Sequence, residues 1–175
     1  MNNETQFIGQ SATFQDMVDR ASLAANLDRP VLVVGERGTG KELIAERLHR
    51  LSPRWDRPYV IMNCAALPET LIEAELFGHE AGAFTGATKS RAGRFEEASG
   101  GTLFLDELAT LSSAAQERLL RAIEYGEITR VGASRPIRVD VRIVAATNEH
   151  LPALVAHNRF RADLLDRLSF EVITL

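Results

Sequence analysis

The stretch that decides the fold is VLVVGERGTGKE, residues 31–42. Its first four residues form a continuous apolar run, as in a strand covered on both faces of a parallel sheet. Glycines and a lysine follow at phosphate-loop spacing, before a helical apolar pattern that includes Leu43, Ile44 and Leu48. The alternative is a glycine turn before a helix, but strand, loop, lysine and helix together favour a site for nucleotide phosphates. The predicted phosphate-binding residues are Gly35, Glu36, Arg37, Gly38, Thr39, Gly40 and Lys41.

Apolar runs alternate with helical patterns on both sides of this loop. The expected strands cover residues 31–34, 59–62, 102–105, 142–146 and 171–175. This alternation predicts an α/β domain with a mainly parallel five-stranded sheet between helices. Ser113 and Gln116 resemble a capping box that opens one helix, and Pro68 suits the first turn of another. Segments 78–93 and 126–140 interrupt the pattern, and the second is predicted to form a projecting hairpin.

The composition excludes several classes of protein. The 175 residues are 45% hydrophobic and 25% charged, as in one globular domain. A net charge of −4 gives no global positive field to hold nucleic acid non-specifically. No apolar run approaches the ~18 residues of a membrane span, and the N-terminus lacks a secretory signal. A single cysteine, Cys64, cannot form an internal disulfide, so we expect a cytoplasmic protein.

An acidic pair follows the run 102–105. In a parallel sheet Asp106 ends its strand at the same edge as the phosphate loop, so it can bind Mg²⁺. The adjacent Glu107 can orient an attacking water. The alternative for the pair is a helix N-terminal cap. Glu42 stands where the generic motif places a metal-binding hydroxyl, so other groups must help to hold magnesium.

Polar residues also end two other predicted strands. Asn63 follows one strand, and the pair Thr147 and Asn148 follows another. From position alone, each is as readily a turn former as a contact of the γ-phosphate. Arg161 and Arg167 lie on an amphipathic segment whose charged face, from sequence alone, is a solvated surface.

Several motifs together resemble one known family. GAFTGA occupies residues 82–87, and its small residues make a slim loop that presents an aromatic ring and a hydroxyl. With GERGTGKE, GGTLFLDEL, AATN and FRADLLDRL elsewhere in the chain, this run resembles the central AAA+ ATPase domain of bacterial enhancer-binding proteins, the activators of sigma-54 RNA polymerase. The resemblance covers nearly the whole chain. Glu42 after the lysine is normal in this family.

The resemblance implies an AAA+ P-loop ATPase that uses ATP and Mg²⁺. The phosphate loop and Glu42 would bind the triphosphate, Asp106 would position the metal, and Glu107 would polarise the water. Asn63 would switch the orientation of Glu107, and sensor I would consist of Thr147 and Asn148. The arginine fingers, which reach the ATP of a neighbouring subunit, would be Arg161 and Arg167. The adenine pocket would include Ile8 and Gly9. For Ile8 and Gly9 the alternative is core packing.

The resemblance also implies partners. A homo-oligomeric ring, sixfold in the family, would remodel the closed complex of sigma-54 RNA polymerase into the open one. Arg130, within 126–140, would belong to a second loop beside the first. The predicted sigma-factor contacts of the first loop are Gly82, Ala83, Phe84, Thr85, Gly86 and Ala87.

Residues 1–175 are interpreted as one sigma-54 interaction domain, truncated before the family's helical lid and before its helix-turn-helix domain. DNA contact would need that missing domain. Two other classes stay open: a nucleotide-binding interaction module without turnover, and another P-loop motor such as a clamp loader or helicase. Glu107 and the two arginines disfavour the first class, and GAFTGA disfavours the second. A small-molecule kinase lacks support, since no substrate-lid motif is evident.

Overall fold

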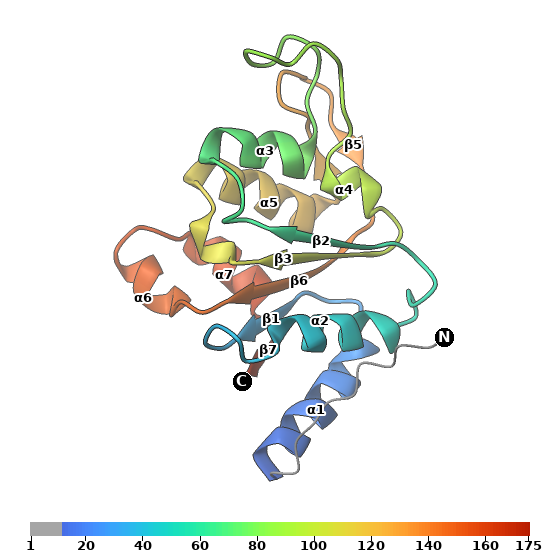
Figure 1. Ribbon diagram of the computed structural model, residues 1–175, viewed down its shortest axis with the longest axis vertical. Coiled ribbons are helices and arrows are strands. Elements are labelled where there is room, and N and C mark those ends of the chain that lie inside the picture. The colour runs from blue at the N-terminus through green and yellow to red at the C-terminus, as the bar shows by residue number, and fades with distance from the viewer. Residues whose placement is uncertain (1–11) are drawn as a thin grey trace.

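The computed structural model describes residues 12–175, and its centre is a five-stranded parallel sheet (Figure 1). The strand order is β2-β3-β6-β1-β7. Each predicted strand is confirmed to within one residue at either end. The strands are β1 Val31–Val34, β2 Tyr59–Asn63, β3 Thr102–Asp106, β6 Arg142–Thr147 and β7 Glu171–Thr174.

Helices cover both faces of the sheet, so its strands are apolar on both sides. In Figure 1, α1 and α2 lie on one face, and α3, α5 and α7 lie on the other. Along β3, Phe104 packs toward α1 and α2, whereas Leu103 and Leu105 join the core of the opposite layer. The helices are α1 Ala12–Ala25, α2 Lys41–Arg50, α3 Glu69–Phe77, α4 Arg94–Glu97, the 3₁₀ turn Leu108–Thr110, α5 Ser113–Tyr125, α6 Leu151–Ala156 and α7 Ala162–Leu168.

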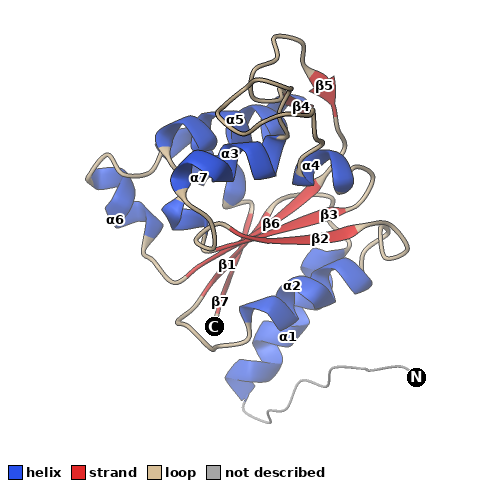
Figure 2. Cartoon of the chain, turned by 45° about the horizontal axis from the view of Figure 1, so that its top comes forward, coloured by secondary structure: helices blue, strands red, loops and turns tan. Residues whose placement is uncertain are grey.

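The predicted hairpin is present, but its strands are short. Only β4 Glu127–Ile128 and β5 Ile137–Arg138 pair with each other. Val131 instead bonds to the base of the loop that contains GAFTGA: its N–H donates to Gly78 O at 2.9 Å, and its carbonyl accepts from Glu80 N at 3.0 Å. The two segments therefore project together from one end of the domain (Figure 2).

The predicted capping box is wrong by one residue. Ser112 is the N-cap of α5, and its hydroxyl oxygen accepts a hydrogen bond from Ala115 N at 3.1 Å. Gln116 therefore falls one position beyond the capping-box site and points into the core, where it is 2% exposed. Pro68 is the N-cap of α3, immediately before its first turn.

Arg142 joins two helices to the sheet from inside the protein. It begins β6 and is 3% exposed. Its guanidinium donates to Ala24 O at 2.7 Å, to Ala25 O at 3.0 Å and to Leu48 O at 3.3 Å. These carbonyls lie at the C-terminal ends of α1 and α2, where helices have unpaired acceptors and negative dipole ends. Burial lowers the pKa of the Arg142 guanidinium, and the carbonyls stabilise the charged form.

We expect Arg142→Met to reduce the free energy of unfolding by about 3 kcal/mol or more, because each buried carbonyl left without a donor costs about 1–3 kcal/mol. Urea unfolding measures the change. The matched control is Arg138→Met at an exposed position on β5, for which we expect a change within about 0.5 kcal/mol. Equal effects of the two substitutions would contradict the role assigned to Arg142.

Candidate functional site

The predicted phosphate loop connects β1 directly to α2. Gly38 and Gly40 have φ angles of 76° and 89°, a left-handed conformation that favours glycine. Lys41, the first residue of α2, is 8% exposed. Its ammonium donates to Gly35 O and to Glu36 O, both at 2.8 Å. The loop's own carbonyls thus hold the lysine ammonium beside the backbone that would face a phosphate.

A cleft of about 520 Å³ opens beside this loop at the carboxyl edge of the sheet. Parallel register brings Asn63 and Asp106 to adjacent positions at the ends of β2 and β3. The structure therefore brings residues predicted from four separate strand ends into one place, although Gly35, Glu36 and Thr147 do not line the cleft. The cleft is lined by Arg37, Gly38, Thr39, Gly40, Lys41, Glu42, Leu43, Asn63, Asp106, Glu107 and Asn148.

The acidic pair has an unusual backbone. Glu107 has a φ of 53°, which is uncommon for a residue with a side chain. Its N–H donates to Asp106 Oδ1 at 2.9 Å. Cys64 directly follows β2, and its backbone N–H donates to the Asp106 carbonyl at 2.9 Å. Burial, reinforced by the carboxylates of Asp106 and Glu107, raises the pKa of its thiol to about 12. Cys64 is therefore an unreactive core residue.

The donor set of the cleft fits magnesium that arrives with a phosphate ligand. Carboxylates of Glu42, Asp106 and Glu107 line the same space. Within residues 12–175, no group of three or more acidic, histidine or cysteine side chains is placed to hold a metal. Mg²⁺ is commonly bound by one or two carboxylates together with substrate phosphates and water, so this sparse set is suitable.

The polar residues at the other strand ends divide into two kinds. Asn63 lines the cleft, and its side-chain oxygen accepts from Ala65 N at 2.9 Å. Asn148 also lines the cleft and is exposed. Thr147 is fully buried, and its hydroxyl oxygen accepts from Glu149 N at 2.9 Å. Asn63 and Thr147 thus form turns, and Asn63 and Asn148 face the cleft.

Neither predicted finger arginine lines the phosphate cleft, whose described cations are Arg37 and Lys41. Arg161 makes a two-point ion pair with Asp163, at 3.0 and 2.9 Å. This pair raises the pKa of Arg161 and lowers the pKa of Asp163. Arg167 donates from Nε to Glu124 Oε1 at 3.0 Å. Both guanidinium groups are held by carboxylates of their own chain.

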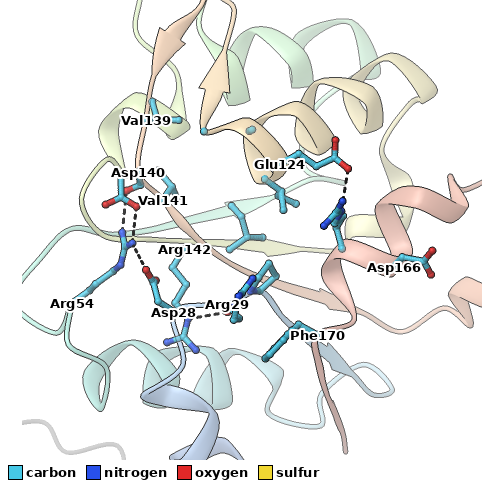
Figure 3. A pocket seen from close by; sticks show the side chains of 16 residues that line it. Asp28, Arg29, Arg54, Glu124, Val139, Asp140, Val141, Arg142, Asp166 and Phe170 are labelled. Atoms are coloured by element: carbon cyan, nitrogen blue, oxygen red, sulfur yellow. Dashed lines mark hydrogen bonds and ion pairs between the residues drawn. The ribbon is translucent and has the colours of Figure 1, made fainter.

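A second hollow of about 380 Å³ lies at the amino edge of the sheet (Figure 3). Arg54 there bonds to Asp28 at 3.1 Å and to Asp140 at 2.7 Å. The guanidinium of Arg29 lies 5.2 Å from the centroid of the Phe170 ring. Arg142 uses its donors on backbone carbonyls, and Arg167 is paired as described above. Because these charges already have partners, we interpret this hollow as structural.

The GAFTGA loop differs from expectation at its aromatic residue. Phe84 is half-buried, not fully exposed, because the ring of His79 packs edge-to-face against it at 5.0 Å. Ala87 is buried as well, at 7% exposed. Gly82 and Gly86 have φ angles of 80° and 96°, which glycine adopts without strain.

Arg130 lies at the base of the two loops. Its guanidinium donates to both carboxylate oxygens of Glu96 at 2.9 Å, and it lies 3.6 Å from Glu80. These contacts raise its pKa and link the second loop to α4 and to the first loop. A contact of Arg130 with a partner protein stays a prediction.

Ile8 and Gly9, the predicted adenine-pocket residues, lie outside the described residues. Within the described part of the chain, no helix is long and apolar enough to cross a membrane.

Three contributors to the site were missed in the sequence. Leu43 lines the cleft, although its apolar spacing indicates only a helix core. His79 packs on Phe84, and Gln116 bonds to the backbone of Arg161. Both contacts join residues without periodic spacing, so no sequence pattern could have identified them.

Comparison with known proteins assigns the chain to a family. The model of the sigma-54 interaction domain matches residues 7–174. The chain belongs to the sigma-54 interaction domain family. These domains are AAA+ P-loop NTPases of bacterial transcription activators, so the predicted family and fold class are confirmed.

Relatives of this sigma-54 interaction domain are regulators of transcription. The Psp operon transcriptional activator of Escherichia coli K12 is 61% identical over 96% of this chain and 52% of its own length. The Nif-specific regulatory protein of Azotobacter vinelandii is 53% identical over 98% of this chain and 33% of its own length. The chain thus spans about half of the first protein and a third of the second.

A solved relative contains a nucleotide. NtrX from Brucella abortus, in complex with ATP, has a TM-score of 0.89 and 32% identity, covering 97% of this chain and 36% of that chain. That similarity supports nucleotide binding by the family fold.

Proposed function

We propose that this sigma-54 interaction domain binds ATP with Mg²⁺ and hydrolyses it to drive transcription activation. The observation that carries the proposal is the meeting of Lys41, Asp106 and Glu107 in one cleft at the carboxyl edge of the sheet. A phosphate-positioning loop, a carboxylate for the metal and a second carboxylate for the water are the parts that phosphoryl transfer to water requires. The ATP complex of NtrX supports the choice of nucleotide.

Each residue has a defined task in this proposal. The backbone N–H groups of residues 35–41 and the N-terminus of α2 bind the phosphates, and the Lys41 ammonium exchanges its loop carbonyls for phosphate oxygens. Asp106 would hold the magnesium ion, with Glu42 beside it in the same cleft. When bound, Mg²⁺ neutralises charge that develops on the transferring phosphoryl group. Glu107 orients the water, and Asn63 and Asn148 supply polar contacts beside it.

The arginine fingers act between subunits in this proposal. Arg161 and Arg167 lie away from the phosphate cleft of their own chain, and each is paired with a carboxylate. An arginine from a neighbour would stabilise the charge of the transition state and would couple hydrolysis to assembly of a homo-oligomeric ring, sixfold by family inference. The intrachain ion pairs would then compete with the neighbour's triphosphate.

Sigma-54 RNA polymerase is the proposed target in the cytoplasm, with remodelling of its closed complex to the open one as the result. Two loops, 78–93 and 126–140, project together from the domain and are joined at Val131. Phe84 and Thr85 lie on the first loop, where a partner can reach them. Because the net charge is −4, DNA contact is assigned to other parts of such a protein.

Lys41→Ala is expected to weaken ATP binding more than tenfold, because a charge-assisted contact contributes about 1.5–3 kcal/mol. Glu107→Gln should bind ATP normally and lose turnover. Titration calorimetry measures binding, and phosphate release measures hydrolysis. The control is Lys89→Ala, a change at the chain's other lysine, which should leave affinity unaltered. Unchanged affinity in Lys41→Ala would remove the site assignment, and turnover in Glu107→Gln would remove the role of Glu107.

Mixing two inactive variants tests the fingers. Subunits with Arg161→Ala keep an intact cleft, and subunits with Glu107→Gln keep an intact finger, so mixed rings of the complete protein should regain part of the hydrolysis rate. A double variant that carries both substitutions should stay inactive at every concentration and serves as the negative control. If mixed rings form without any recovery, the intersubunit assignment is wrong.

Phe84→Ala separates contact with the sigma factor from stability. Loss of a half-buried ring and its edge-to-face pair should cost about 1 kcal/mol, whereas Phe95→Ala in the core, where Phe95 is 1% exposed, should cost about 3–5 kcal/mol. ATP hydrolysis should persist in Phe84→Ala. Binding to sigma-54 in the presence of a metal-fluoride analogue of the transferring phosphate should disappear. Transcription activation at the wild-type level by Phe84→Ala would contradict this role for the loop.

A further inference from the structure

Gln116 is a buried polar residue that takes no part in the chemistry described above. It lies in the first turns of α5 and is 2% exposed. A buried amide must have hydrogen-bond partners, since an unpaired one costs about 1–3 kcal/mol. The partners of Gln116 therefore show which segments it holds together.

Those partners lie before two different helices. Nε2 donates to Leu111 O at 2.9 Å, just ahead of α5, and to Arg159 O at 3.4 Å. Oε1 accepts from Arg161 N at 2.9 Å. The amide of Gln116 thus fixes the main chain of the turn from Arg159 to Arg161 against α5.

This turn carries the arginine that leads α7. Arg161 is the N-cap residue of α7, and its extended backbone has φ −75° and ψ 129°. Asp163, in the first turn of the same helix, holds the guanidinium at two points. The side chain of Arg161 is thus oriented from α7, and its main chain is anchored from α5.

The same helix supports the other end of α7. Glu124, near the end of α5, accepts a hydrogen bond from Arg167 at 3.0 Å. Between these contacts Leu119 of α5 and Leu164 and Leu168 of α7 are fully buried in one core. The two helices therefore behave as one packed unit, and a shift of the Arg161 turn requires loss of the Gln116 bonds.

We propose that Gln116 is a positioning residue for Arg161: it fixes the backbone from which this arginine reaches the triphosphate bound to a neighbouring subunit. This inference rests on the proposed function, in which Arg161 acts between subunits. A displacement of about 1 Å at a catalytic group can reduce a rate about 10²-fold. The backbone nitrogen that Gln116 holds is two covalent bonds from the Cβ of Arg161, so loss of this hydrogen bond is sufficient to displace the arginine side chain.

The test adds Gln116→Met to the mixed rings of the complete protein. Methionine has a similar length but provides neither hydrogen bond to the Arg161 turn. In one mixture the change is placed on the Glu107→Gln subunits, which donate the arginine. In the other it is placed on the Arg161→Ala subunits, which provide only the cleft. ATP hydrolysis is measured at equal total protein concentration, and ring formation is verified for each mixture.

We expect the recovered rate to fall about tenfold or more when Gln116→Met is on the arginine-donating subunits, and to change less than about twofold on the cleft-donating subunits. Hydrolysis in the second mixture also demonstrates that subunits with Gln116→Met fold and assemble. Equal losses in both mixtures, or no loss in either, would overturn the inference. Neither of these two outcomes contradicts the proposed intersubunit function. That function is contradicted only if the mixture without Gln116→Met shows no recovery of hydrolysis, and the inference about Gln116 is then overturned as well.

Gln116→Glu gives a second measurement on the arginine-donating subunits. Its carboxylate keeps an acceptor for Arg161 N–H and loses the amide donor. We expect it to retain more of the recovered rate than Gln116→Met does. A loss at least as large as that of Gln116→Met would overturn the assignment of the Oε1 contact as the anchor.

Discussion

Parallel pairing places the carboxyl ends of β1, β2, β3 and β6 at one edge of the sheet, and the rest of the site depends on this alignment. The phosphate loop leaves β1 there, and Asn63 and Asp106 end adjacent strands in register. Helices cover both faces of the strands, so the strands themselves are buried. The loops at the carboxyl edge can carry polar and charged groups, and ligands of such folds bind there. An antiparallel neighbour would end at the opposite edge of the sheet, away from the N-terminus of α2.

Charge pairing within the chain bears on the proposed intersubunit role of Arg161 and Arg167. The described cations of the phosphate cleft are Arg37 and Lys41, while Arg161 and Arg167 are held by Asp163 and Glu124. Arginine pairs with phosphate as well as with carboxylate, so in the proposed function a neighbour's triphosphate would compete with Asp163 and Glu124 for these arginines. The rate of ATP hydrolysis would then depend on contact between neighbouring subunits.

The projecting loops are connected to the site through β2, α3 and the contacts at the base of the loops. β2 ends at Asn63 in the cleft, α3 follows, and the GAFTGA loop begins one residue beyond Phe77, which stacks on Phe95 at a centroid distance of 5.5 Å. The base of the loop bonds to Val131 and, through Glu80, approaches Arg130. In the proposed function, these contacts are where a change at the nucleotide site would reach the two loops.

The sequence by itself determined the five strands, the phosphate loop and the acidic pair, because local spacing and apolar runs specify them. Thr147 and Asn148 are alike in sequence, but only the fold decided that the first is buried and the second faces the cleft. The contact of His79 with Phe84 and that of Gln116 with Arg161 could not be predicted from the sequence. In each case the spacing between the two residues matches no helical or strand period. Tertiary packing decided them, because buried polar groups and aromatic rings take whichever partners the assembled layers bring within reach.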